Sequence, residues 1–505
     1  MDIIKESLII VGSIFGVLTF YREIYKWIGF FMKSRTYPTT TIKREYAVLI
    51  PARNEEKVIG NLIDSIKLQN YDQSKITIFV VADNCTDQTA IVAKTHGAIC
   101  YERFDDQKKR KGYALDYLVN RIKKDYDINA FDGFFVFDAD NVLELDFIEE
   151  MNKAFVQTNS IVTSYRNTKN FDTNWISASY GIHFYRRSMA YHRPRSILGI
   201  GTHLSGTGFL MPTSVISEGF HFHELTEDTE MTMVASANGM KIAYCESAIH
   251  YDEQPTSLKV ALTQRLRWTK GRLNVFKKTW RNTIKGIFKS NGFTNYDLFF
   301  YLFPYSLVEL GFQICLMVGG VITALLLGGS LNIGGFFIAV LLYYLAKYVS
   351  NLFYNTLAVI REKKNISCPF YKTVFFLIVS PWFQLISIYL MVVSLFKNVQ
   401  WHPIVHSDSK TIDEIKQDKK TIQILNTKSI FWKVMETFGI VIGLLGLILF
   451  TYINQVIEIS FMNRITYFVI PSMAIVSIVF FSSYVFNKKT GDERQNKKAK
   501  MSSKE

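Results

Sequence analysis

Three aspartates, Asp83, Asp138 and Asp140, are placed in the sequence so that their carboxylates could bind a cation together. Asp138 and Asp140 flank a single alanine after the apolar run FFVF, and Asp83 ends an earlier apolar run. Two residues spaced in this way along an extended strand lie on one face. Carboxylate oxygens are ligands that Mg²⁺ or Mn²⁺ prefers, and such a cation in turn holds phosphates. Because clustered like charges are unfavourable until a cation neutralises them, the pattern predicts a divalent metal. A turn or a helix cap is the commoner meaning of D-x-D by itself.

Three further motifs could act on a ligand. Lys111 precedes a glycine at the start of an amphipathic pattern, where a phosphate could bind, although a solvated basic loop fits the composition equally. Gly206 and Thr207 lie in the run SGTG, which either lets the backbone approach a ligand or forms a tight turn. Glu227 and Asp228 begin a helical pattern, where a capping box is the structural alternative.

The stretch QRLRWTKGR places Gln264, Arg267 and Trp268 within two helical turns. Arginine pairs well with phosphate, and tryptophan offers a flat face to a sugar ring. The same residues could instead anchor an amphipathic helix at a membrane surface. The motif therefore predicts either a diphosphate and sugar site or an interfacial helix.

Alternating strands and helices must position these residues. The runs YAVLIP, ITIFVVAD and FFVF each read as a strand, and each is followed by a polar loop and a helical pattern. Successive units of this kind predict a parallel sheet, whose ligands bind beyond the carboxyl ends of the strands. Residues 51–55, Asp83, Asp138 and Asp140 all fall there. The polar block, roughly residues 45–290, is long enough for one α/β domain.

Apolar segments flank this block. Residues 7–20, continued by aromatic and basic residues to Phe30, predict a spanning helix; a signal peptide would need a basic start, but the chain begins MDIIKE. Further apolar runs lie near 298–328, 333–355, 371–396, 434–453 and 465–486.

The basic clusters orient these runs. If both REKK (361–364) and KQDKK (416–420) face the cytoplasm, residues 371–396 cannot cross the membrane. They would lie at the interface or re-enter, with a helix break at Ser380-Pro381; a sixth crossing is the alternative. This predicts a multi-pass plasma-membrane protein with five crossings, an external N-terminus and a cytoplasmic polar block.

These boundaries divide the chain into six regions. They are an N-terminal transmembrane anchor (1–44), a cytoplasmic catalytic domain (45–290), a transmembrane hairpin (291–356), an interfacial or re-entrant segment with a loop (357–433), a second transmembrane hairpin (434–487) and a basic cytoplasmic tail (488–505).

Composition excludes several classes of protein. With 505 residues, 49% hydrophobic and 20% charged, the chain is neither disordered nor fibrous. Its net charge of +14 would suit nucleic acid, but the basic clusters map to membrane boundaries, which argues against that partner. The five cysteines are far apart, so neither a disulfide framework nor a zinc site is indicated. A pure channel or transporter would not explain the acids at a sheet edge.

In this order and spacing, PARNEE, VVADNCTD, RKGYALDYL, DAD, GTG, TED and QRLRW resemble the signature of the processive family-two glycosyltransferases, which include cellulose, hyaluronan and chitin synthases. The resemblance covers roughly residues 45–280. It implies an α/β GT-A domain with a mostly parallel sheet and helices on both faces, embedded in a multi-pass α-helical membrane domain. It also implies a UDP-sugar donor, Mg²⁺ or Mn²⁺, and inversion at the anomeric carbon.

The resemblance also implies a role for each motif residue. Asp228 would be the general base and Asp140 the metal ligand. The UDP moiety would be held by Ala52, Asn54, Glu55, Asp83, Lys111, Asp138, Gln264 and Arg267. The acceptor sugar would contact Gly206, Thr207, Glu227 and Trp268, and a loop near residues 400–403 would cover the site.

The implied product is a β-linked homopolysaccharide that passes across the membrane. The single-chain plan is similar to the bacterial capsular glucan synthases, which favours UDP-glucose. UDP-N-acetylglucosamine, a hyaluronan-like alternation and a non-processive transferase acting on a lipid stay open. The expected partners are the UDP-sugar, the growing polysaccharide and membrane lipids, and a homo-oligomer is left open. The short tail would leave no room for a cyclic-nucleotide-sensing domain.

Overall fold

The structure is a computed structural model that describes residues 2–289, 291–327, 333–426, 437–446 and 448. Of the two predicted C-terminal crossings, 465–486 lies outside the described residues and 434–453 lies partly outside them, with a short apolar helix described at Thr437–Gly446. The basic tail also lies outside.

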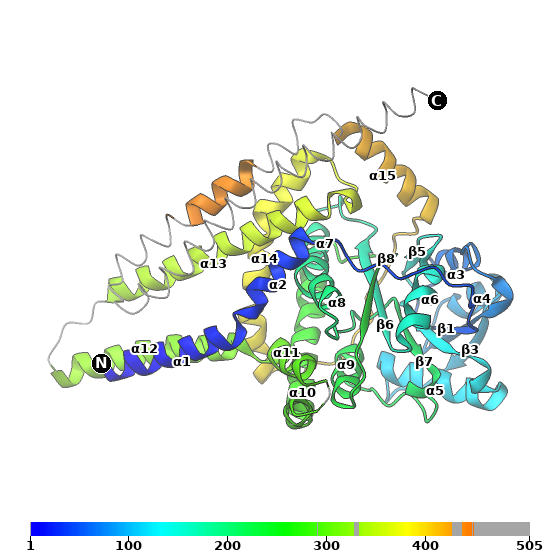
Figure 1. The fold of residues 1–505 in the computed structure, drawn as a ribbon, viewed down its shortest axis with the longest axis horizontal. Helices are drawn as coiled ribbons and strands as arrows, with labels where there is room; N and C mark the ends of the chain where they lie inside the picture. Colours follow the sequence, from blue (N-terminus) through cyan, green and yellow to red (C-terminus); the bar gives the residue numbers. More distant parts are fainter. Residues whose placement is uncertain (1, 290, 328–332, 427–436, 447, 449–505) are drawn as a thin grey trace.

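An eight-stranded sheet organises the polar block (Figure 1), with the strand order β3-β2-β1-β4-β7-β6-β8-β5. The strands are β1 Tyr46–Ala52, β2 Ile76–Asp83, β3 Ile99–Arg103, β4 Gly133–Val136, β5 Val142–Leu143, β6 Val162–Thr168, β7 Phe209–Pro212 and β8 Ala243–Asp252. The predicted strands at 46–51, 76–83 and 134–137 are therefore confirmed within one or two residues at each end.

The sheet is mostly parallel, as the sequence predicted, and two reversed strands, β5 and β7, make it mixed. Strands β1 to β4 are parallel, as are β6 and β8, but β7 runs antiparallel to β4 and β6, and β5 antiparallel to β8. Strand β7 runs antiparallel because of where it begins. Phe209 pairs with Val136 at the carboxyl end of β4, so the chain must run back along that strand.

Helices cover both faces of the sheet, as predicted. Strand β1 is almost fully buried, and its alternate residues face two different cores. Val48 and Ile50 pack with helices α3 (Ile59–Lys67) and α6 (Phe147–Thr158). Ala47 and Leu49 pack with α5 (Lys111–Asp125) and α9 (Glu227–Ala237). Burial on both faces explains the continuous apolar runs of the parallel strands.

A second group of helices lies beside the sheet, and α1, α12 and α13 reach farthest from it (Figure 1). The group comprises α1 Asp2–Thr19, α2 Tyr21–Phe31, α7 Trp175–Arg187, α10 Leu258–Ile287, α11 Gly292–Leu302, α12 Tyr305–Leu327, α13 Ile333–Arg361, α14 Phe370–Phe396 and α15 Ile412–Asn426. Helix α15 packs against β5 and β8. The predicted N-terminal helix is thus divided into α1 and α2. The run at 298–328 is divided before Pro304, which has no N–H to continue a helix.

Among the described residues, α14 is the one helix long and apolar enough by itself to cross a membrane. Helix α11 and the Tyr305–Gly319 part of α12, bent by 54°, would be a second candidate if they form one span. The expectation of a multi-pass domain is therefore not confirmed by the described helices.

The predicted helix break at Ser380-Pro381 is wrong. Helix α14 continues through Pro381, whose missing N–H would have bonded to the carbonyl of Leu377. The hydroxyl of Ser380 donates to that carbonyl instead, at 2.8 Å, and in turn accepts a hydrogen bond from Asn355. A neighbouring hydroxyl can thus satisfy the carbonyl group that proline frees.

Candidate active site

Lys111 joins three motifs that are far apart in the sequence. It begins helix α5, and its Nζ donates to Asp138 Oδ1 at 2.6 Å and to the carbonyl of Gly206 at 2.7 Å. The same nitrogen lies 3.6 Å from Glu227 Oε1. Burial alone would raise the pKa of Asp138, but Lys111, together with the charges of Arg166 and His406, holds that pKa below its ordinary range. The predicted residues Lys111, Asp138, Gly206 and Glu227 therefore share one site.

The glycine-rich loop needs both of its glycines. Gly206 and Gly208 have φ of +86° and +66°, in the left-handed region that favours glycine. Between them, Thr207 Oγ1 accepts the backbone N–H of Asp138 at 2.8 Å. A Cβ added at Gly206 would lie 3.8 Å from Asp228 Oδ2. The loop therefore links the strand end that bears Asp138 to the start of α9.

Glu227 and Asp228 begin helix α9, whose N-terminus carries a partial positive charge. The capping-box alternative is not found, because the side chain of Thr226 makes no capping hydrogen bond. Burial raises the pKa of Glu227 to about 7, Lys111 opposes the rise, and the charge of Asp228 adds to it. An acid that titrates near neutral pH thus lies beside Asp228.

Helix α10 contributes polar atoms that lack partners. Arg267 Nε and Gln264 Oε1 are buried without a hydrogen bond. The guanidinium of Arg267 interacts electrostatically with Glu227, Asp138 and Asp228. Because leaving a buried polar atom unpaired is costly, these atoms are typical of a site that takes a polar ligand.

Trp268 faces a different neighbourhood. Its ring lies 5.8 Å from that of Tyr180, edge to face, in a cluster that includes Phe383 of α14. The structure therefore places Trp268 against α7 and α14.

Asp83 and Asp138 each have a cationic partner within the protein. It forms a buried ion pair with Arg103 of β3, while Asp138 is paired with Lys111. The sequence reasoning that only a metal would neutralise the acids was therefore incomplete, because protein cations already do so. In the part of the chain that the structure describes, no three His, Cys, Asp or Glu side chains form a group that could hold a metal.

Asp140 retains the capacity to bind a cation. Its Oδ1 accepts a hydrogen bond from Asn141 at 3.1 Å, and its Oδ2 accepts the backbone N–H of Glu253 at 2.9 Å. Each carboxylate oxygen has a second lone pair. Asp138 and Asp140 therefore fit a divalent cation that takes its other ligands from phosphate and water.

The loop after β1 is hydrogen-bonded to the loop after β2. Ala52 is buried at the end of β1. Asn54, with φ of +58°, accepts the N–H of Thr86 at 2.8 Å, and the N–H of Glu55 donates to Thr89 Oγ1 at 2.8 Å. The side chain of Asn54 is thus engaged in holding two loops together.

The sequence reasoning missed His406. This residue lies on the segment between α14 and α15, three residues beyond the predicted covering loop at 400–403. Its Nδ1 is hydrogen-bonded to Glu55 Oε1 at 2.8 Å, and its Nε2 lies 4.0 Å from Asp140 Oδ2. Burial raises the pKa of Glu55 to about 7, against the effect of His406. Burial alone would lower the pKa of His406, but Asp140 and Glu55 raise it to about 10.

A second missed group lies at the carboxyl ends of β6 and β8. Arg166 Nε donates to Asp252 Oδ2 at 2.7 Å, and its Nη1 donates to the carbonyl of Ser205 at 2.8 Å. Burial raises the pKa of Asp252 to about 6. Asp252 Oδ1 and both amide atoms of Gln254 are buried without partners. Local sequence patterns gave no signal for this group.

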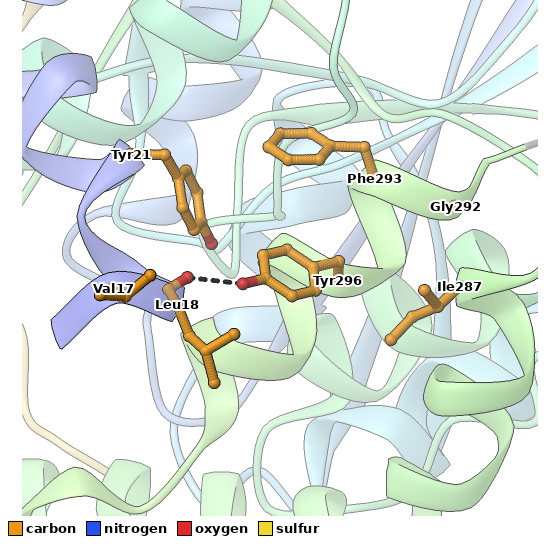
Figure 2. Close-up of a pocket in the computed structure, with 7 residues that line it drawn as sticks. All are labelled: Val17, Leu18, Tyr21, Ile287, Gly292, Phe293 and Tyr296. Atoms are coloured by element: carbon orange, nitrogen blue, oxygen red, sulfur yellow. Dashed lines mark hydrogen bonds between the residues drawn. The ribbon is translucent and has the colours of Figure 1, made fainter. Parts of the chain in front are cut away.

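A hollow of about 400 Å³ lies elsewhere, between α1, α2, α10 and α11 (Figure 2). Apolar and aromatic side chains line it, and the hydroxyl of Tyr296 donates to the carbonyl of Leu18 at 2.6 Å. None of the site residues described above lines this hollow.

The mixed α/β sheet with acids at one edge defines a GT-A-like domain. The model of the family described as glycosyltransferase like family 2 matches residues 43–271. These residues therefore form a glycosyltransferase family 2 domain, which supports a sugar-transferring enzyme.

Two curated relatives carry glycosyltransferase names. "Probable glycosyltransferase YdaM" of Bacillus subtilis (strain 168) is 25% identical over 359 residues, covering 67% of this chain and 77% of that protein. The 4,4'-diaponeurosporenoate glycosyltransferase of Staphylococcus aureus (strain MRSA252) is 46% identical over 59 residues, covering 12% of this chain and 15% of that protein.

Two solved structures have weaker likenesses. The mannosyltransferase PcManGT from Pyrobaculum calidifontis, in complex with GDP-Man and Mn²⁺, is 14% identical with a TM-score of 0.42, covering 64% of this chain and 92% of that one. S. aureus TarS 1–349 in complex with UDP is 12% identical with a TM-score of 0.37, covering 72% and 95%. Both TM-scores lie below 0.5, so the fold assignment depends on the strand order and the family match.

Proposed function

We propose that the chain is an inverting, UDP-sugar-dependent β-glycosyltransferase. One observation carries the proposal. Lys111, Asp138, Glu227 and Asp228, from three separate elements, meet at the sheet edge of a family 2 domain, with the charge of Arg267 acting on the same acids.

The residues of this site suit a displacement at the anomeric carbon. Asp228 would accept the proton of an acceptor hydroxyl while that oxygen forms a bond to C1 of the donor sugar. The bond from C1 to the phosphate oxygen would break on the opposite side, which inverts the anomeric centre. A positioned carboxylate typically contributes about 10²–10⁴-fold in rate as a general base.

The departing UDP must be stabilised as its charge develops. Lys111 and Arg267 would supply fixed positive charge there, and Gln264 would supply a hydrogen-bonding group. Asp138 and Asp140 would hold a divalent cation, which neutralises diphosphate charge when bound. Ala52, Asn54, Glu55 and Asp83 remain proposed contacts of the nucleotide.

The position of α10 supports an acceptor path toward a membrane. Arg265 Nη2 donates to Ser387 Oγ and Lys270 Nζ donates to the carbonyl of Ser394, both at 2.7 Å. These bonds attach the helix that bears Trp268 to α14, the described helix that could cross a membrane by itself. We therefore propose that the acceptor is a growing β-linked homopolysaccharide, made from UDP-glucose and passed across the membrane by a multi-pass chain with its catalytic domain in the cytoplasm. Gly206, Thr207, Glu227 and Trp268 would contact this acceptor.

A lipid acceptor is the second candidate. It is favoured by the likeness over 59 residues to an enzyme named for 4,4'-diaponeurosporenoate. Such a transferase would add sugar to a membrane-dissolved molecule without elongating a polymer.

One experiment separates the candidates. Full-length protein in lipid nanodiscs is supplied in turn with radiolabelled UDP-glucose, UDP-N-acetylglucosamine and UDP-glucuronic acid, with Mg²⁺ or Mn²⁺. High-molecular-weight label that a linkage-specific β-glucanase releases supports the polymer, whereas label in the organic extract supports the lipid acceptor. No transfer from any of the three donors would contradict the proposed function.

A further inference from the structure

We propose that Asp252 and Gln254 bind hydroxyl groups of the donor sugar and determine which sugar the enzyme accepts. The inference rests on the proposed function in one respect, that the donor is a nucleotide sugar whose diphosphate lies at Asp138 and Asp140. It gives a role to buried polar groups that the proposed transfer chemistry does not use.

The order of the strands places these two residues beyond the diphosphate. Strands β1 and β2 lie on one side of β4, and β7, β6 and β8 lie on the other. Because β7 is antiparallel to both β4 and β6, the carboxyl ends of β6 and β8 lie at the same edge as that of β4. A ligand whose nucleoside lies at the ends of β1 and β2, and whose diphosphate lies at β4, therefore extends toward β6 and β8. Asp252 ends β8, and Gln254 follows it.

The residue between the two is attached to the proposed cation ligand. The backbone N–H of Glu253 donates to Asp140 Oδ2 at 2.9 Å. In a nucleotide sugar, a single oxygen atom joins the sugar to the diphosphate, so the sugar must lie next to the residues that hold the phosphates. Asp252 and Gln254 are therefore close to the expected position of the sugar.

Arg166 leaves one oxygen of Asp252 free. Its Nε donates to Asp252 Oδ2 at 2.7 Å, and its Nη2 donates to the same oxygen. Its Nη1 donates instead to the carbonyl of Ser205, at the start of the glycine-rich loop, at 2.8 Å. Asp252 is 2% exposed and its Oδ1 has no hydrogen bond, so this oxygen can accept one from a hydroxyl group.

Gln254 is held by its backbone and not by its side chain. Its N–H donates to Asn170 Oδ1 at 3.0 Å, and its carbonyl accepts a hydrogen bond from Asn170 Nδ2 at 2.8 Å. The residue is 1% exposed, yet both polar atoms of its side-chain amide lack a hydrogen bond. Because buried polar groups are normally satisfied by protein, ligand or water, this amide indicates a missing polar partner.

The hydroxyl groups of a sugar match the free atoms. Each hydroxyl can donate one hydrogen bond and accept others. Asp252 Oδ1 and Gln254 Oε1 would accept from hydroxyls, and Gln254 Nε2 would donate to one. The two side chains are neighbours, since burial raises the pKa of Asp252 and the amide of Gln254 acts in the opposite direction. A site that pairs substrate hydroxyls in this way rejects a sugar that leaves its buried groups unpaired.

The test separates binding of the sugar from binding of UDP. Full-length protein in detergent with Mn²⁺ is titrated calorimetrically with UDP and with the C-glycosidic analogues of UDP-glucose and UDP-N-acetylglucosamine. In these analogues a methylene group replaces the oxygen between C1 and the phosphate, so the sugar is not transferred. The sugar increment is defined as the affinity for the tighter analogue divided by the affinity for UDP.

Two variants change the proposed sugar contacts. Gln254→Met removes the amide at similar volume. Asp252→Asn lets Arg166 keep its oxygen partner and puts an NH₂ group in place of the free Oδ1. The matched control is Gln417→Met, at an exposed position of α15. Thermal unfolding of each variant checks that the fold is retained.

We expect the sugar increment to fall at least about tenfold in Gln254→Met and in Asp252→Asn, with UDP affinity unchanged. Gln417→Met should keep both affinities. The Tm of Gln254→Met should be unchanged or higher, because the variant removes a buried amide that has no partner in the ligand-free protein.

An unchanged sugar increment in either variant would overturn the inference, including the case in which sugar transfer slows and the residues contact the acceptor instead. A lower Tm with an equal loss of UDP and analogue affinity would indicate a structural role and would overturn it too. The same holds if the unmodified protein binds neither analogue more tightly than UDP. The labelled-sugar assay reports separately on the proposed function: absent transfer contradicts that function, whereas normal transfer with an unchanged increment overturns only this inference.

Discussion

Replacing Lys111 by methionine keeps most of the side-chain volume and removes the charge at the centre of the site. The change removes the cationic partner of Asp138 and Glu227 and the hydrogen-bond donor to the carbonyl of Gly206. Breaking a fully buried ion pair costs about 3–5 kcal/mol, whereas an exposed pair contributes about 0–1 kcal/mol. The side chains of Lys111 and Glu227 are 16% and 12% exposed, but that of Asp138 is 39% exposed, so solvent screens part of the loss.

Because these side chains are partly exposed, we expect Lys111→Met to lower the free energy of unfolding by an intermediate amount, about 2–3 kcal/mol. For a domain of this size it corresponds to a fall in Tm of about 4–12 °C. The assay is thermal unfolding of the full chain in detergent at a fixed scan rate. The control is Lys109→Met, which removes the same charge from an exposed pair with Asp106 on the same loop and should leave Tm almost unchanged.

The loss of stability caused by Lys111→Met should increase with pH. The pKa of Glu227 is raised to about 7 in the folded protein, above its unfolded value, so the folded state holds this proton more strongly and Glu227 becomes less favourable as the pH rises toward 8. Lys111 compensates for that charge only when Glu227 is ionised. The loss of Tm caused by Lys111→Met should therefore be larger at pH 8 than at pH 6. An equal loss at both pH values, or a larger loss at pH 6, would refute the reasoning.

Three further outcomes follow from the structure. Arg193→Met should lower stability by about 3–5 kcal/mol in thermal unfolding, because it leaves the buried carboxylate of Glu362 and the half-buried one of Glu246 without their cation, and Arg193→Lys should recover only part; an unchanged Tm would contradict this. Arg267→Ala should weaken UDP binding about 10–100-fold in calorimetric titration, the loss of one charged hydrogen bond, and equal affinity would argue against its phosphate role. Asp140→Ala should abolish the metal dependence of UDP binding, and a persistent Mn²⁺ effect would count against Asp140.

Local patterns predicted the parts of the fold that depend on neighbouring residues. The apolar runs that became β1, β2 and β4 are buried on both faces, so each run is strongly apolar and its polar end is visible in the sequence. For the same reason the strand-end residues Asp138 and Asp140 were found.

Tertiary pairing could not be predicted in this way. His406 is hydrogen-bonded to Glu55, which is 351 residues away in the sequence. No periodic pattern links the segment between α14 and α15 to the loop after β1. The pairing of Asp83 with Arg103 likewise depends on the registry of two strands. The helix break expected at Pro381 failed because the hydroxyl of Ser380 satisfies the freed carbonyl, a contact that proline chemistry alone does not reveal.

The most direct test of the proposed transfer chemistry compares Asp228→Asn with the unmodified protein in two measurements, sugar transfer from the labelled donor and binding of UDP. We predict that kcat falls by about 10²–10⁴-fold, equivalent to about 2.7–5.5 kcal/mol of barrier. UDP affinity should stay the same, because the proposed phosphate contacts, Lys111 and Arg267, are unchanged in this variant. Normal transfer by Asp228→Asn would contradict the account.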